Sequence, residues 1–162
     1  MTPEDKQSAG VSPKRSSEEI DVVAYSGRKN LLQVVECKSW IHSRGVTLAA
    51  FDGAGVPFNK KDGQHFQLFN KPKLREIVFA RLREQFVASG ACRSNANIKL
   101  CLASAHIVDG HRNELRQHFA EKGWELWDEA WLEEQLKLMS ERGYENQVSA
   151  VVAKLLLRGK AK

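Results

Sequence analysis

Two short apolar segments near the start of the chain constrain the fold most strongly. Residues 19–25, EIDVVAY, and residues 31–40, LLQVVECKSW, are rich in side chains that favour β-strands. The five residues between them, SGRKN, have the polar and glycine-containing composition of a turn. The two segments therefore predict an antiparallel β-hairpin whose apolar face needs a core to cover it.

Alternating helices and strands are predicted for the rest of the chain. Residues 41–70 contain several glycines and predict an extended or looping segment. The later segments are, in order, a helix over 72–89, a strand over 97–105, a helix over 110–123, a strand over 124–128 and helices over 129–143 and 146–159. Asp128 is placed to cap the helix that follows it. This order predicts an α/β fold, a mixed central β-sheet flanked by helices.

A chain of 162 residues suits one domain with a single core. Residues 1–18 are polar and predict a disordered tail or linker, residues 19–158 form the predicted domain, and residues 159–162 are a basic tail. No apolar run is long enough to cross a membrane, and the N-terminus lacks the apolar region of a secretory signal. Three cysteines without a CxxC pair indicate a reducing, cytoplasmic setting.

The charged residues are unevenly distributed. The net charge is +5, and residues 38–85 hold nine Lys or Arg residues against four Asp or Glu residues. Residues 121–145 show the reverse, with three basic and eight acidic residues. The middle of the chain is a candidate surface for a polyanion, although solvated helix faces explain the same distribution equally well.

Alternation along the hairpin brings charged residues together. Side chains of one strand alternate between faces, so Glu36 and Lys38 share a face and Cys37 points the other way. With the turn centred between residues 28 and 29, Asp21 lies opposite Glu36, at a Cβ separation of about 5 Å. The sequence therefore predicts two carboxylates and one ammonium group at one end of the hairpin.

A divalent cation would offset the repulsion between these carboxylates. Mg²⁺ prefers oxygen ligands and is often held by one or two carboxylates, so Asp21, Glu36 and the backbone carbonyl of Cys37 are the candidate ligands, with Mn²⁺ as a substitute ion. Lys38 suits a catalytic role, in which it assists an attacking water or stabilises charge on a phosphate.

The segment EIDVVAY…LLQVVECKSW resembles the core motif of the PD-(D/E)xK, or restriction-endonuclease-like, nuclease superfamily. That motif has an acidic residue on one strand and (Asp/Glu)-x-Lys on the next; Asp21 matches the first and Glu36-Cys37-Lys38 the second. Residues 72–105 are similar to the helix and strand that follow in the common core, and residues 113–136 resemble an extension found in Mrr-type branches. The resemblance implies a metal-dependent endonuclease that cuts DNA to leave a 3′-hydroxyl and a 5′-phosphate.

The sequence departs from this family before residue 19, where a helix that usually carries another acidic residue is not evident. Glu4, Glu18 and Glu19 are candidates for that acid. A shortened variant, a truncated chain, and completion by a partner, either a second copy or another protein, remain open explanations. Two functions from other classes also remain: a non-catalytic nucleic-acid-binding or assembly module that keeps the fold, and an interaction domain that uses the acidic residues 121–145.

Basic residues that follow the motif are candidates for contact with the nucleic-acid backbone, although each is individually explained as a surface residue. They are His42, Arg44, Lys60, Lys61, Lys71, Lys73, Arg75, Arg81 and Arg83. Trp124, Trp127 and Trp131 could stack on bases, but their positions favour packing within the fold.

Overall fold

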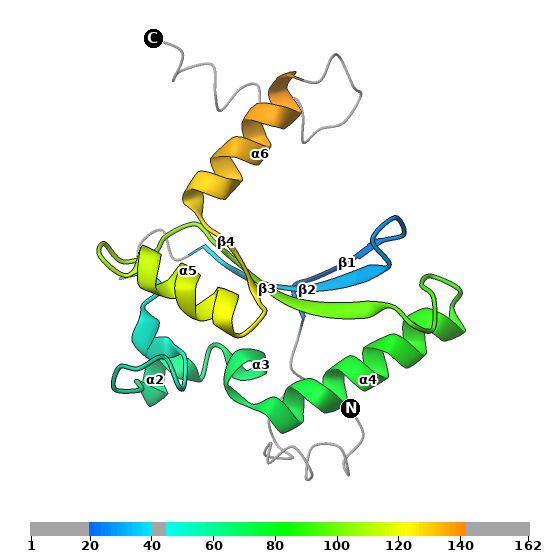
Figure 1. The fold of residues 1–162 in the computed structure, drawn as a ribbon, viewed down its shortest axis with the longest axis horizontal. Helices are drawn as coiled ribbons and strands as arrows, with labels where there is room; N and C mark the ends of the chain where they lie inside the picture. The colour runs from blue at the N-terminus through cyan, green and yellow to red at the C-terminus, as the bar shows by residue number, and fades with distance from the viewer. Residues whose placement is uncertain (1–19, 40–44, 142–162) are drawn as a thin grey trace.

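The predicted hairpin forms one half of a four-stranded sheet. The computed structural model describes residues 20–39 and 45–141, and its sheet has the order β1-β2-β3-β4. β1 (Val22–Ser26) is antiparallel to β2 (Leu31–Lys38), whereas β2, β3 (Asn97–Ser104) and β4 (Glu125–Trp127) run parallel to one another. The predicted α/β class with a mixed sheet is confirmed (Figure 1).

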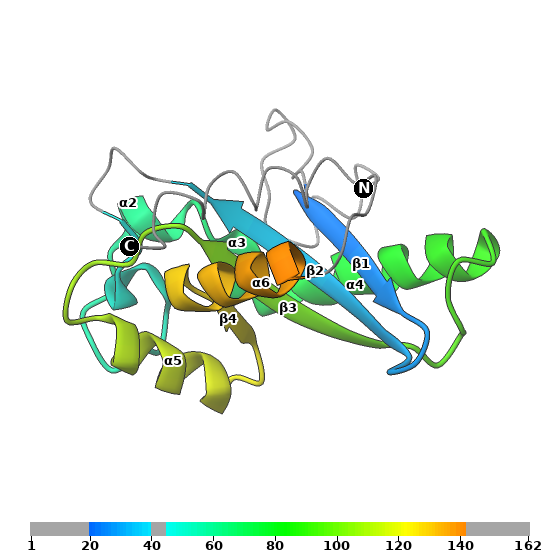
Figure 2. The same ribbon diagram turned by 90° about the horizontal axis from the view of Figure 1, so that it is seen from above.

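Helices cover the two faces of the sheet unequally. α4 (Pro72–Ala88) and α5 (Arg112–Glu121) lie on one side, together with the short α3 (Gln67–Asn70). α6 (Glu129–Glu141) lies on the other side and extends away from β4, as Figures 1 and 2 show. None of these helices, within the described part of the chain, is long and apolar enough to cross a membrane.

The helix ends follow the sequence signals. Pro72 occupies the first turn of α4, and Gly90, with φ of 70°, follows its last turn. α5 ends before Gly123, whose φ is 69°. The carboxylate of Asp128 accepts a hydrogen bond from the N–H of Trp131 at 3.1 Å, which confirms the predicted cap of α6. The helix expected over 146–159, and both predicted tails, lie outside the described residues.

The core fills the space between the sheet and the helices on its α4 side. β2 and β3 contribute alternate apolar side chains to it, among them Val34 and Leu102, while α4 and α5 contribute Leu74 and Phe119; all four are at most 2% exposed. Each such side chain stabilises the fold by roughly 1.5–3 kcal/mol through burial. The sheet that carries the charged hairpin end is thereby fixed on one face.

The prediction of an extended or looping segment over 41–70 is wrong for three short stretches of its described part. It contains a 3₁₀ turn η1 (Leu48–Ala50), α2 (Lys60–Gly63) and α3. Three of its aromatic side chains, Phe51, Phe66 and Phe69, are buried, and Phe51 lies 5.0 Å from Phe119 between ring centroids. The physical reason is that these rings supply core that the short sheet lacks, and their burial outweighs the weak helix propensity of the glycine-containing sequence.

Candidate active site at the end of the hairpin

The register between β1 and β2 is the one expected from the turn. Val23 pairs with Val34 and Tyr25 pairs with Leu32. The turn is stabilised by Asn30, which adopts a φ of 49° and accepts a hydrogen bond from the Tyr25 hydroxyl at 2.9 Å. The confirmed register directs Asp21, one residue before β1, toward the end of β2.

Asp21 lies directly beside the (Asp/Glu)-x-Lys segment. Its Oδ2 atom accepts a hydrogen bond from the backbone N–H of Cys37 at 2.7 Å. Cys37 is the residue between Glu36 and Lys38, so the carboxylate of Asp21 is anchored to the middle of this tripeptide. The structure therefore brings the three predicted residues to one end of the hairpin.

Glu36 and Lys38 form an ion pair with each other. Lys38 Nζ donates to Glu36 Oε1, and the two side chains are only 18% and 16% exposed. The alternation of β2 places both on the face that carries the buried Val34. Lys38 Nζ also lies 5.9 Å from the centroid of the Phe66 ring. The ammonium group is thus held between a carboxylate and an aromatic face, at the border of the core.

The pKa of the Cys37 thiol, on the opposite face of β2, depends on the charges of Asp21, Glu36 and Lys38. Partial burial raises the pKa of the Cys37 thiol, and the negative charges of Asp21 and Glu36 raise it further, while Lys38 lowers it. The two carboxylates therefore act together on one nearby group.

The oxygen atoms available at this site suit a hard divalent cation. Asp21 uses one oxygen for Cys37 and Glu36 uses one for Lys38, which leaves one oxygen on each carboxylate without a partner among the described residues. The N–H and C=O of a strand residue point to the same side, so the Cys37 carbonyl faces the edge where Asp21 lies. Two carboxylates and a carbonyl are a ligand set that Mg²⁺ accepts when water and substrate complete it. Across residues 20–39 and 45–141, no group of three or more His, Cys, Asp or Glu side chains is arranged to hold a metal ion.

The basic residues proposed to contact a nucleic acid divide into two kinds. Lys60, Lys61 and Lys73 are exposed on α2 and α4. Lys71 is half-buried and donates to Gln67 Oε1 at 2.7 Å. Arg75 is engaged inside the fold.

The guanidinium of Arg75 donates to the carbonyl oxygens of Leu68 at 2.8 Å and Phe69 at 3.1 Å, and it lies 5.5 Å from the Trp124 ring centroid. These bonds satisfy carbonyls of α3 and join it to α4. Of the remaining candidates, Arg83 is exposed and Arg81 pairs with Glu84 at 3.3 Å. His42 and Arg44, like Glu4, Glu18 and Glu19, lie outside the described residues.

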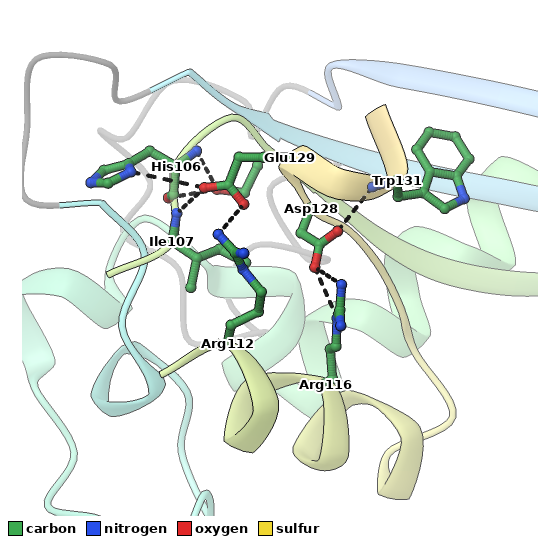
Figure 3. Close-up of polar contacts among 8 residues, drawn as sticks. His106, Ile107, Arg112, Arg116, Asp128, Glu129 and Trp131 are labelled. Atoms are coloured by element: carbon green, nitrogen blue, oxygen red, sulfur yellow. Dashed lines mark hydrogen bonds and ion pairs between the residues drawn. The ribbon is translucent and has the colours of Figure 1, made fainter. Parts of the chain in front are cut away.

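A second polar cluster, shown in Figure 3, was not predicted from the sequence apart from the cap that Asp128 provides. Asp128 is 1% exposed and accepts two hydrogen bonds from Arg116, one of them from Nε at 2.9 Å. Glu129 accepts from the Ile107 N–H at 2.8 Å and from Arg112 at 3.1 Å. These bonds connect α6 to α5 and to the segment after β3.

The nitrogen Nδ1 of His106 lies 3.8 Å from Glu129 Oε1 at the edge of this second cluster. The carboxylates of Asp128 and Glu129 are both occupied by arginine and by backbone N–H groups. We therefore assign the cluster a structural role. The signal that could have indicated it is the adjacent acidic pair at the start of a helix, where carboxylates favour the N-terminal dipole.

The tryptophans pack within the fold in two ways. Trp124 packs against the core, 5.1 Å from Phe69 between ring centroids. Trp127 and Trp131 stack on each other at 4.7 Å and remain half-buried beside β4 and α6. On that face Gln33 donates to Glu125 at 3.0 Å, away from the candidate site.

Comparison of the chain with protein-family models, with curated proteins and with solved structures found no match. The functional argument therefore rests on the geometry of the hairpin end.

Proposed function

We propose that this chain is a metal-dependent nuclease that hydrolyses phosphodiester bonds, with DNA as its substrate and a restriction-endonuclease-like core. The observation that carries the proposal is the hydrogen bond from Cys37 N–H to the Asp21 carboxylate, because it places a second acid beside Glu36 and Lys38 at a strand end. The sequence predicts that these residues lie together, and this hydrogen bond is a direct contact between the two parts of the motif. The contact supports their use as one site.

Asp21 and Glu36 would hold Mg²⁺ through their remaining oxygen atoms, together with the Cys37 carbonyl. A bound Mg²⁺ would lower the pKa of a coordinated water and neutralise charge on the phosphate. The protein's own contribution is rigidity. β2 is fixed by β1 on one side and β3 on the other, so the ligand positions are set before substrate arrives.

Lys38 is suited to orient the attacking water or to contact a phosphate oxygen. An ammonium group has three N–H donors, and Glu36 takes one of them. The others remain for water or substrate at the exposed edge of the site. The ring of Phe66 limits the positions that this long side chain can take, which favours a fixed donor geometry.

Cleavage of supercoiled plasmid DNA tests the proposal. We expect nicking or linearisation with Mg²⁺ or Mn²⁺ and none with EDTA. Glu36→Gln keeps the shape of the side chain but removes its charge, and it should abolish cutting. Glu134→Gln on α6 is the matched control, since Glu134 is exposed and distant from the hairpin along the sheet order. Unchanged cutting by the Glu36→Gln protein would refute the assignment.

The ion pair between Glu36 and Lys38 also favours a second candidate, a nucleic-acid-binding or assembly module without catalysis. In that case the pair satisfies its own charges at the core border and serves the fold. Such a protein binds DNA with a steep dependence on salt through its exposed lysines but cuts none with any divalent cation. The plasmid assay and a binding titration over salt concentration separate the two.

A further inference from the structure

A cavity of about 320 Å³ opens between α2 and α3. Its wall combines an aromatic ring, side-chain amides and two cations; the residues that matter here are Phe58, Lys60, Gly63, Gln64, Gln67 and Lys71. This combination differs from the apolar core beneath it. It offers a flat surface, hydrogen-bonding groups and positive charge in one place.

The frame of the cavity is fixed by hydrogen bonds. The Asn70 amide donates to the carbonyls of Ala50 at 2.8 Å and Gly63 at 3.1 Å, and its oxygen accepts from the N–H of Asp52 at 2.9 Å. Asn59 caps α2 with its side-chain oxygen, at 3.1 Å from the Lys61 N–H. The cavity is therefore a built feature of this segment.

The ring of Phe58 lies against the backbone of Gly63. A Cβ atom on Gly63 would come within 2.3 Å of the ring, so only glycine permits this position. Phe58 is nevertheless 37% exposed. One part of the ring is fixed by Gly63 while another part remains open to a ligand.

The polar groups of the wall retain hydrogen-bonding capacity. The side chains of Lys60 and Gln64 are exposed and make no hydrogen bond or ion pair among the described residues. Lys71 donates to the oxygen of Gln67, which leaves the Gln67 NH₂ group as a donor. The carboxylate of Asp52 adds an acceptor to the same wall.

The cavity and the candidate active site are linked by one short segment of chain. Phe66 precedes α3, whose residues line the cavity, and its ring lies under Lys38. The segment that lines the cavity through α3 therefore also contacts Lys38 through Phe66.

We propose that the cavity binds one unpaired nucleotide of a single-stranded or locally opened nucleic acid. Phe58 stacks on the base, the amides of Gln64 and Gln67 bond to its edge, and Lys60 and Lys71 contact the adjoining phosphates. The inference rests on the proposed function, and it adds that the substrate presents an unpaired base. The aromatic ring and the amides favour a base over an acidic peptide, which would use the lysines alone.

Binding of short oligonucleotides to the full chain tests this inference. The probes are fluorescein-labelled (dT)₈ and a strand of equal length in which the bases are replaced by abasic residues, measured by fluorescence anisotropy in EDTA. We expect (dT)₈ to bind roughly fivefold to a hundredfold more tightly, as stacking of a base on an aromatic side chain predicts. Equal affinity for both strands, or equal competition by a poly-glutamate peptide, would overturn the inference.

Variants of the cavity residues test whether the difference in affinity between (dT)₈ and the abasic strand arises in the cavity. Phe58→Ala should remove most of the preference for (dT)₈, whereas Val87→Ala, which truncates a similarly exposed apolar side chain at the far end of α4, should leave it intact. Gly63→Ala displaces the Phe58 ring without changing charge and should act like Phe58→Ala. Thermal unfolding checks that each variant is folded. A retained preference in a folded Phe58→Ala protein contradicts the proposal.

Failure of this inference can be told apart from failure of the nuclease proposal. The binding assay contains no metal, so its result does not depend on cleavage. A protein that cuts plasmid but binds both strands equally keeps its proposed function and loses the nucleotide site. A protein that prefers (dT)₈ through Phe58 but never cuts keeps the site and supports the binding-module alternative.

Discussion

Lys38 lies over the ring of Phe66, with its Nζ atom 5.9 Å from the ring centroid. The lysine belongs to the hairpin motif, and the phenylalanine belongs to a segment that sequence patterns assign to a loop. The contact joins the end of β2 to the start of α3 and makes the position of a candidate catalytic group depend on the packing of both.

Replacement of Lys38 by alanine should lower the rate of plasmid cleavage by at least about a hundredfold, the range in which a positioned acid or base contributes. The fold should persist, because the Glu36 side chain keeps a 16% exposed part through which water can solvate its carboxylate. Circular dichroism and a cleavage time course measure the two effects. Lys99→Ala is the matched control, since Lys99 pairs with Glu125 at 3.1 Å on the opposite face of the sheet. Equal losses in both variants would contradict a specific role for Lys38.

Asp21→Asn should lower the pKa of the Cys37 thiol. The charge of Asp21 raises that pKa in the folded protein, so removal of the charge makes the thiolate easier to form. The pH dependence of iodoacetamide reaction, measured in a Cys92→Ser background, should move to lower pH. Lys38→Ala should move it to higher pH, because Lys38 lowers the same pKa. Asp109→Asn, in an exposed loop, should change nothing. An unaltered profile in Asp21→Asn would mean that its carboxylate is not beside Cys37.

Asp128→Ala should reduce the free energy of unfolding by about 1–3 kcal/mol, because α6 loses its cap and Arg116 loses its partner. Asp128→Asn should reduce the free energy of unfolding by less. Asparagine still caps the helix, so this variant loses only the ion pair with Arg116. Urea unfolding followed by tryptophan fluorescence gives both values. Glu134→Ala, exposed on the same helix, is the control. Equal losses for the two Asp128 variants would show that the cap contributes little.

Stability should fall as the pH drops below about 6.5, partly because of His118. Burial lowers the pKa of this imidazole, and Lys122 lowers it further, while Glu121 opposes the shift. His118 is therefore protonated in the unfolded chain at a pH where it is still neutral in the folded protein. The free energy of unfolding falls as the pH decreases from the pKa of His118 in the unfolded chain to its lower pKa in the folded protein. The loss should be smaller in His118→Phe, which keeps an aromatic ring among Phe51, Phe119 and Trp124.

Urea unfolding at several pH values between 7 and 5 measures this difference. Gln85→Ala, at an exposed position and without a titrating group, serves as the control and should keep the wild-type pH dependence. If His118→Phe and the wild type lose stability in parallel, His118 is not the group responsible.

The hairpin and its register could be predicted because both depend on local sequence. The turn has five residues, and alternation fixes which side chains share a face, so Val23 opposite Val34 follows once the turn is centred. The helices over 72–88 and 112–121 were recognisable from their apolar spacing and their glycine stops. In each case neighbours in sequence decide the structure.

The short helices and the polar contacts could not be predicted in this way. Phe51 and Phe66 are buried because they meet each other, 4.8 Å apart between ring centroids, and that meeting depends on how the whole segment crosses the sheet. The hydrogen bond from Ile107 to Glu129 likewise joins residues that only the completed fold brings together. The same holds for the candidate site. Its residues could be identified from the local sequence, whereas the position of Lys38 over Phe66 depends on the completed fold.

The parallel pairing of β2 with β3 has a consequence for the order in which the protein assembles. The hairpin closes a short loop, whereas Leu31 can meet Asn97 only after all of α4 has been brought back across the sheet. Such long-range pairing is slow relative to hairpin formation. Asp21, Glu36 and Lys38 span fewer than twenty residues, yet Lys38 pairs with Ser104 and rests on Phe66. A nascent hairpin therefore carries the charged residues early, and the position of Lys38 beside Ser104 and Phe66 is reached only with this long-range closure.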